Sequence, residues 1–288
     1  MADRLSTLEK ANYPRPDFIR RDWMSLDGKW EFAFPDQITG AFPQEYKDSS
    51  LPSDILVPFC YSAAASGIGC APSYEEVYYA RSFSINSRQL TGEVLLKFGA
   101  VDYLCRIWIN ETYIGSHCGG HTQFEFPISS YLHPGENRIY VLASDNRDCD
   151  RPRGKQYWKE HPDRCWYTNT VGIWKSVWLE FTSPQYIQRV KITPDIDRRC
   201  IELEAFLNEN CDGVLRADIS FGNELRRSVS FLFKNAHYIR EFISIAEEDF
   251  VDEIHYWDCS SPNLYDLTLS LSNGDQADCY FGMRKIET

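Results

Sequence analysis

Apolar and polar residues alternate in short runs along most of the chain. This is the pattern of a β-strand, whose successive side chains point to opposite faces. Such runs occur around residues 94–98, 105–109, 139–143, 201–207, 215–221 and 265–271. Turn-forming residues such as Gly119-Gly120 and Asn273-Gly274 separate them, and no segment shows the 3.6-residue period of an amphipathic helix. The pattern therefore predicts an all-β protein.

A break at Thr182-Ser183-Pro184 divides the predicted strands into two groups. Before the break, the strands predict an antiparallel jelly-roll β-sandwich over residues 1–183. After it, about seven short strands predict an immunoglobulin-like β-sandwich over residues 184–288, with a turn at Cys211-Asp212-Gly213. The length of 288 residues fits two domains of about 100 to 200 residues each.

Residues 172–181 differ from the other strands because both of their faces carry large apolar side chains. Ile173, Val177 and Leu179 share one face, while Trp174 and Trp178 share the other. A half-solvated strand would have one polar face, so we expect this strand to be covered on both sides. The long polar loop before it, residues 145–167, is rich in Arg, Asp and aromatic residues. We place the ligand site in this loop.

Charge and composition narrow the classes of partner. The chain has 30 Lys plus Arg against 42 Asp plus Glu, a net charge of -12 that repels phosphate backbones and predicts no nucleic-acid partner. No stretch approaches the roughly 20 apolar residues that span a bilayer, and the first residues do not read as a secretory leader, so we expect a cytoplasmic protein without a membrane partner. The ten cysteines contain no CxxC pair and predict reduced thiols.

Two clusters have some features of a metal site. His117 and His121 flank Cys118, but a structural zinc site needs a fourth ligand. A turn with a hydrogen-bonded His117 is the better interpretation. The acidic residues 145–150 lack the glycine of a calcium loop and carry Arg147 in place of an oxygen ligand. We therefore predict no metal, and no sequence motif indicates a cofactor.

Residues 171–180, VGIWKSVWLE, residues 261–265, SPNLY, and residues 281–287, FGMRKIE, form a set of ordered motifs. The set resembles glycoside hydrolase family 2, the group of β-galactosidases, β-glucuronidases and β-mannosidases. The first motif resembles the end of the family's sugar-binding domain, and the other two are similar to two signatures of its second domain. Further matching pieces, in the family's order, are residues 26–32, 57–59, 79–83 and 98–102, then Asn110 with Gly115 and His117, Gly119-Gly120 with Phe124, and residues 135–137. The resemblance covers nearly the whole chain.

The resemblance implies a sugar-binding domain and an immunoglobulin-like domain of a retaining enzyme that hydrolyses β-glycosides. In the family, the segment similar to residues 281–287 leads into a TIM barrel that carries two catalytic glutamates. Here only Thr288 follows. We therefore expect the chain to hold no catalytic residue, to be inactive alone, and to have the missing C-terminal barrel as its partner. The alternative is a free-standing, lectin-like carbohydrate-binding module.

Carbohydrate binding requires aromatic faces for the pyranose ring and planar groups for its hydroxyls. Loop 145–170 supplies both, and we predict carbohydrate contacts from Arg153, Lys155, Tyr157, Trp158, Trp166, Tyr167 and Asn169. The resemblance also brings residues 67–77 near the active site, which adds Tyr74 and Glu75.

Three of these predictions have alternatives. At the position six residues before Gly172, some family members have an aspartate that holds a sugar hydroxyl. This chain has Trp166 at that position instead. Trp158 and Trp166 could instead pack against the missing barrel. Adjacent Glu75 and Glu76 fit a solvated turn better than a catalytic pair, which needs carboxyl groups about 5 to 5.5 Å apart. Exposed aromatics of the loop, or Trp174 and Trp178, predict self-association into a homo-oligomer.

Overall fold

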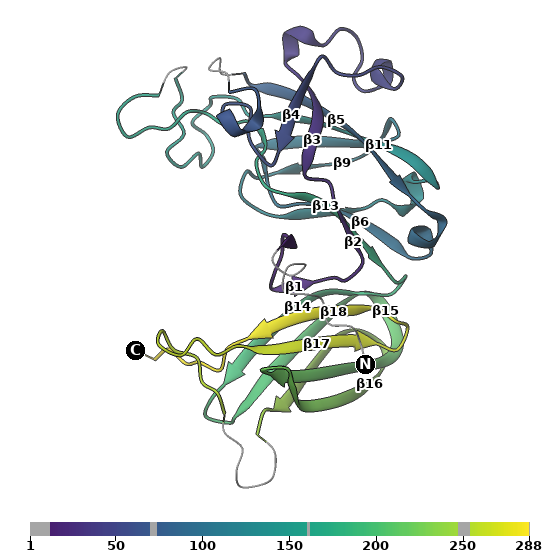
Figure 1. Cartoon of the computed structure of the whole chain (residues 1–288), viewed down its shortest axis with the longest axis vertical. Coiled ribbons are helices and arrows are strands. Elements are labelled where there is room, and N and C mark those ends of the chain that lie inside the picture. Colours follow the sequence, from purple (N-terminus) through teal and green to yellow (C-terminus); the bar gives the residue numbers. More distant parts are fainter. Residues whose placement is uncertain (1–11, 70–73, 160–161, 247–253, 288) are drawn as a thin grey trace. The chain divides into compact units, whose positions relative to one another are not determined.

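The computed structural model describes residues 12–69, 74–159, 162–246 and 254–287, which belong to two compact units (Figure 1). The first unit is Trp23–Phe181, and the second combines the residues up to Asp22 with Thr182–Thr288. The named elements are eighteen strands and five 3-10 turns, so the all-β prediction is confirmed. The turns are η1 (Pro35–Gln37), η2 (Gln44–Tyr46), η3 (Ala64–Ser66), η4 (Ser87–Leu90) and η5 (Ser129–Tyr131). No helix in the described ranges is long and apolar enough to cross a membrane.

The first unit contains two antiparallel sheets packed around one apolar core. The six-stranded sheet has the order β4-β3-β5-β11-β8-β9, and the four-stranded sheet has the order β10-β6-β13-β2. Strands β7 and β12 form a separate short pair. The strands are β2 (Trp23–Ser25), β3 (Gly28–Ala33), β4 (Ser53–Val57), β5 (Glu76–Ile85), β6 (Glu93–Phe98), β7 (Val101–Asp102), β8 (Leu104–Ile109), β9 (Thr112–Cys118), β10 (Phe124–Pro127), β11 (Gly135–Ser144), β12 (Gly172–Ile173) and β13 (Val177–Thr182).

The alternation read from the sequence fixes which side chains enter this core. In β8, Cys105, Ile107 and Ile109 are buried, while Arg106 is exposed. In the facing sheet, Leu96 and Phe98 of β6 and Leu179 of β13 join the same cluster. Two sheets that each bury one apolar face against the other form a sandwich. The predicted strands around residues 94–98, 105–109 and 139–143 are confirmed.

Strand β13 is buried on both faces, as its sequence predicts. Val177 and Leu179 lie in the core, and Trp178 and Glu180 on the opposite face are equally buried. On that face Lys97 Nζ lies 3.1 Å from a Glu180 carboxylate oxygen and 2.8 Å from one of Glu125. The Trp178 indole donates to Glu180 Oε1 at 2.9 Å. Because Trp178 is buried, it contributes to no exposed patch.

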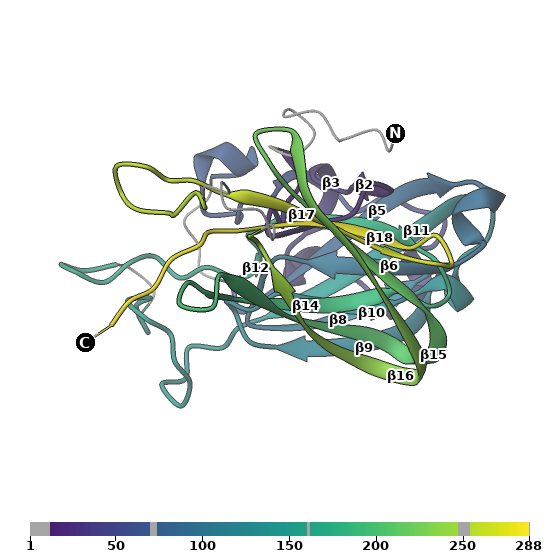
Figure 2. The same cartoon turned by 90° about the horizontal axis from the view of Figure 1, so that it is seen from below.

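The second unit is built around one long hairpin, β15 (Cys200–Phe221) and β16 (Glu224–Ser244), which Figure 2 shows running side by side. The remaining strands are β1 (Phe18–Ile19), β14 (Ile187–Asp195), β17 (Tyr265–Leu271) and β18 (Gln276–Phe281), in the order β1-β18-β17-β15-β14. The predicted turn at Cys211-Asp212-Gly213 is wrong. The register of β15 against β16 shifts there, so the strand continues through an irregularity that also accommodates glycine.

The residues just before β2 pack with the second unit, whereas the sequence division placed them in the first domain. β1 pairs with β18 through Phe18 and Ile19. The Arg20 guanidinium lies 2.7 Å from Asp275 Oδ1 and donates to the Ile187 carbonyl, and both charged side chains are buried. A buried arginine needs such partners. The partners of Arg20 are in the second unit, which is the physical reason for the difference.

Candidate functional site

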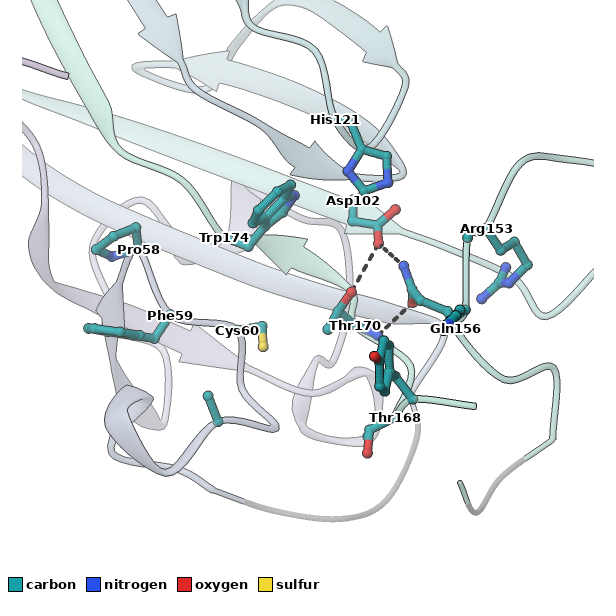
Figure 3. Close-up of a pocket in the computed structure, with 14 residues that line it drawn as sticks. Pro58, Phe59, Cys60, Asp102, His121, Arg153, Gln156, Thr168, Thr170 and Trp174 are labelled. Carbon is teal, nitrogen blue, oxygen red and sulfur yellow. Dashed lines mark hydrogen bonds between the residues drawn. The ribbon is translucent and has the colours of Figure 1, made fainter. Parts of the chain in front are cut away.

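A pocket of about 450 Å³ lies within the first unit (Figure 3). Its lining comes from four parts of the chain: the loop after β4, strand β7, the turn between β9 and β10, and the segment from the β11–β12 loop to the residue after β12. Its described aromatic and polar lining residues are Phe59, Asp102, His121, Arg153, Lys155, Gln156, Tyr167, Thr168, Thr170 and Trp174. Segments far apart in sequence therefore meet at one cavity.

Asp102 is the buried polar centre of this pocket. The residue is only 4% exposed, and Oδ2 accepts hydrogen bonds from Gln156 Nε2 at 2.6 Å and Thr170 Oγ1 at 3.0 Å. Gln156 Oε1 in turn accepts from the Thr170 backbone N–H at 2.8 Å, which fixes the orientation of the amide. Oδ1 has no hydrogen-bond partner among the described residues, so the carboxylate keeps acceptor capacity for a ligand.

Backbone pairing explains why Asp102 and Thr170 meet. Strand β7 pairs with β12 so that Asp102 lies opposite Gly172, which brings the end of the long loop to the carboxylate. A side chain at Gly120 would collide with Asp102 Oδ1, so the turn after β9 approaches closely only because that residue is glycine.

Three aromatic rings give the pocket its apolar surface. Phe59 is 44% exposed and Tyr167 is 63% exposed, while Trp174 is half-buried. The Trp174 indole donates to the Gly120 carbonyl at 2.8 Å, and the His121 ring meets it edge to face at 5.6 Å between centroids. Trp174 is thus held in one orientation. Exposed rings beside a buried carboxylate form the combination that carbohydrate sites use.

Arg153 joins the two ends of the long loop. Its guanidinium lies 2.8 Å from Asp145 Oδ2 and donates to the Asn146 carbonyl at the start of the loop. It also reaches Asn169 Oδ1 at 3.5 Å, near the loop's end. The Tyr157 N–H donates to the Tyr167 carbonyl, and the Tyr167 N–H donates to the Lys155 carbonyl, which holds the two arms together. These contacts position Gln156 against Asp102.

Burial of Asp145 changes its protonation. Burial raises the pKa of this carboxyl to about 6, although Arg153 and Arg151 act to lower it. A free aspartate has a pKa of about 3.9. Between these two values the folded protein binds a proton that the unfolded chain does not, so acidification from pH 6 to pH 4 favours the folded state at this residue.

We therefore expect wild type to gain stability relative to Asp145→Asn as the pH falls from 6 to 4, by at most about 1.4 kcal/mol per pH unit. Urea unfolding of both proteins at pH 7, 5 and 4 measures this. The variant Asp54→Asn removes an exposed carboxylate and controls for the loss of one negative charge. The raised pKa of Asp145 is contradicted if the difference in unfolding free energy between wild type and Asp145→Asn does not change with pH. It is also contradicted if the variant gains stability relative to wild type as the pH falls.

The structure brings some of the predicted site residues together and separates others. Arg153, Lys155 and Tyr167 line the pocket. Asn169 is buried behind it and contacts Arg153. Tyr74 is stacked on Phe34 with 4.1 Å between ring centroids, and Glu75 uses its backbone carbonyl to accept the Asp145 N–H. The sugar contacts of these residues stay a prediction.

The other three predicted aromatics form a separate cluster in the same loop. Trp158 lies 4.7 Å from Tyr157 and 5.0 Å from Trp166, between ring centroids, and is 40% exposed. None of the three is among the described residues that line the pocket. Trp158 and Tyr167 are exposed, as the predicted self-association requires. The self-association itself stays a prediction.

Sequence reasoning missed Asp102, Thr170, Trp174, His121 and Phe59 as pocket residues. Asp102, Phe59 and Trp174 all lie within pieces that carried the family resemblance. The turn predicted at His117 is wrong, because His117 lies in β9 and the turn follows that strand. The predicted hydrogen bond of this histidine is confirmed, with Nε2 3.2 Å from Thr122 Oγ1. No group of three or more metal-ligating side chains occurs in the part of the chain that is described.

Comparison with known families covers both units. The profile "Glycosyl hydrolases family 2, sugar binding domain" matches residues 24–183, and "Glycosyl hydrolases family 2" matches residues 185–284. A β-galactosidase of Priestia megaterium is 24% identical over an alignment 304 residues long. The alignment covers 92% of this chain and 28% of that protein. A β-glucuronidase of Canis lupus familiaris is 27% identical over 213 residues, covering 65% of this chain and 32% of that protein.

Solved structures show the same fold. A β-glucuronidase from an uncultured Clostridium sp. has a TM-score of 0.69 at 20% identity, covering 92% of this chain and 45% of that one. A putative β-galactosidase from Bacteroides fragilis has a TM-score of 0.70 at 19% identity, covering 93% of this chain and 42% of that one. The chain therefore spans less than half the length of these relatives.

Proposed function

The chain belongs to glycosyl hydrolase family 2, and on that premise we propose that it is the carbohydrate-binding and scaffolding region of a retaining enzyme that hydrolyses β-glycosides. One observation carries the proposal. The pocket combines exposed aromatic rings with Asp102, a buried carboxylate whose Oδ2 is held by Gln156 and Thr170 while Oδ1 is left as an acceptor. A pyranose offers the matching apolar face and hydroxyl donors.

We assign hydrolysis to a catalytic domain outside these 288 residues. Retaining glycosidases use two carboxyl groups about 5 to 5.5 Å apart, whereas Asp102 is the single carboxylate in the described lining of the pocket. The relatives named β-galactosidase and β-glucuronidase are several times longer than the matched region. The expected activity of this chain alone toward chromogenic β-glycosides is therefore zero, and turnover by the pure chain contradicts this part of the proposal.

We expect weak but specific saccharide binding by the chain, with Kd of about 1 mM or weaker because part of the site lies elsewhere. Titration followed by NMR measures it. Phe59→Ala should abolish the binding, whereas Phe242→Ala, which removes a similarly exposed ring from the second unit, should leave it unchanged. Equal effects of the two variants would count against the pocket. A Kd of about 10 μM or tighter would instead favour a free-standing module.

A thiol in the pocket reports where the saccharide binds. Cys60 lines the cavity and is half-buried, whereas Cys259 is exposed on the second unit. Saccharide should slow alkylation of Cys60 and leave that of Cys259 unchanged, as peptide mass mapping can show.

The nine described cysteines are all free thiols, which supports our proposal of a reducing, cytoplasmic setting.

A further inference from the structure

The six-stranded sheet of the first unit carries aromatic side chains on its outer face as well as on its core face. A small cluster, separate from the main core, forms there around Tyr140, and Trp108 packs against it. The segment between β3 and β4 covers part of this face: its Phe42 ring lies 5.7 Å from that of Tyr140 and 5.9 Å from that of Trp108, between centroids. Tyr140 is fully buried, whereas Tyr113 on the edge strand β9 is 51% exposed. The chain therefore covers this face over β11 and leaves it open toward β9.

Tyr113, Trp108 and Tyr140 form one row across the neighbouring strands β9, β8 and β11. Tyr113 is paired with Trp108, and Trp108 is paired with Tyr140. The register of β8 against β9 shifts beside the first pair, and Ile114 packs against the main core. A bulge of this kind re-aims the neighbouring side chain, and the exposed Tyr113 ring lies 5.6 Å from the Trp108 ring, between centroids. Two aromatic rings thus lie side by side at the open end of the row.

The polar groups at this open end have unused hydrogen-bonding capacity. Among the described residues, no partner meets the Trp108 indole N–H or the Tyr113 hydroxyl. Arg106 is on the same face of β8, two residues or about 6–7 Å along the strand from Trp108. It is exposed and forms no ion pair with a described residue. Neither β8 nor β9 contains an acidic residue. We call Arg106, Trp108 and Tyr113 the edge platform.

The chemistry of the edge platform matches a glycan chain better than a second copy of the protein. A pyranose ring presents apolar C–H groups to an aromatic ring, and its hydroxyl oxygens accept hydrogen bonds from indole, phenol and guanidinium groups. Two copies joined through this face by a two-fold axis would instead bring the same donors, and the like charge of Arg106, against each other. A β-1,4-linked chain is extended and ribbon-like, so its successive sugar rings can lie along the row.

We infer that the edge platform is a second carbohydrate site, which binds an extended β-1,4-linked glycan. None of its three residues is in the described lining of the pocket, so the inference goes beyond the proposed function. A pocket encloses most of a small ligand, whereas an open sheet face contacts only one side of each sugar. The edge platform therefore binds several linked sugars well and a single sugar poorly.

The test is an NMR titration that follows the indole N–H signal of Trp108, which the variant Trp108→Phe identifies. The ligands are cellohexaose with glucose, and β-1,4-linked galactohexaose with galactose. At least one hexasaccharide should shift this signal, with an affinity about tenfold or more above that of its monosaccharide. If neither hexasaccharide shifts it, the inference is overturned, and protection of Cys60 then judges the proposed function by itself.

Two variants remove parts of the edge platform without touching buried groups. Tyr113→Ala should weaken hexasaccharide binding about tenfold because it removes an exposed ring on which a sugar packs. Arg106→Ala should weaken it in the same direction. Tyr280→Ala is the matched control, since it removes a tyrosine of similar exposure, 42%, from the second unit, and it should leave the affinity unchanged. Equal losses in Tyr113→Ala and Tyr280→Ala overturn the inference.

Phe59→Ala distinguishes the edge platform from the pocket, and it should leave hexasaccharide binding at Trp108 intact. If Phe59→Ala abolishes hexasaccharide binding and Tyr113→Ala does not, the sugar binds only in the pocket. That result overturns the inference and leaves the proposed function standing. If the Trp108 signal instead shifts with protein concentration in the absence of sugar, a second copy covers the edge platform, which also overturns the inference.

Discussion

Replacing Lys97 by methionine is expected to lower the free energy of unfolding of the first unit by about 3–5 kcal/mol. Lys97 and Glu180 are both fully buried, and the Lys97 ammonium lies between the carboxylates of Glu180 and Glu125. Without the ammonium, Glu180 remains as a buried charge, with the Trp178 indole donating to one oxygen. An uncompensated buried charge costs far more than the loss of an exposed ion pair.

The double variant Lys97→Met/Glu180→Gln tests this reason. Glutamine keeps an acceptor for the Trp178 indole and removes the negative charge, so most of the lost stability should return. Lys29→Met is the control, because it breaks the exposed pair with Asp54, at 2.7 Å, and should cost no more than about 1 kcal/mol. Denaturant unfolding measures all three. If Lys97→Met costs no more than Lys29→Met, burial does not decide the strength of this pair.

The fold was predictable because one-sided burial imprints a period of two on the sequence. Cys105, Ile107 and Ile109 alternate with polar or half-buried neighbours, and each lies in the core. Strand β13 was predictable for the opposite reason, since apolar groups on both faces indicate two-sided burial. The turn predicted at Cys211-Asp212-Gly213 was wrong because a strand irregularity uses the same residue types as a turn.

The candidate site was predictable only in part. Loop 145–170 does supply Arg153, Lys155 and Tyr167 to the pocket. The pairing of β7 with β12, which brings Thr170 to Asp102, depends on a register that no local pattern reveals. Aromatic composition likewise could not tell which rings face a cavity and which, like Trp158, pack on their neighbours.

Gly172→Ala is expected to destabilise the first unit by about 2–5 kcal/mol, from the sum of two costs. The residue has φ of +104°, a left-handed conformation that costs a residue with a Cβ about 1–2 kcal/mol. The added methyl group would also overlap the Tyr79 hydroxyl and come within 3.0 Å of its Cζ. Tyr79 is fully buried against Trp30 and Phe32, so it has no room to move. Overpacking of this kind costs about 1–3 kcal/mol.

Gly135→Ala separates the two costs. Gly135 has φ of +99°, but a Cβ at this residue would meet nothing within 4 Å, so the variant should lose only the conformational part, about 1–2 kcal/mol. A second test removes the obstacle: in a Tyr79→Phe background, Gly172→Ala should cost less than in wild type, because the hydroxyl that it would strike is gone. Urea unfolding of these variants and their parents gives the costs. Equal costs at Gly172 and Gly135, or no relief from Tyr79→Phe, would mean that the backbone conformation alone makes glycine necessary beside the pocket.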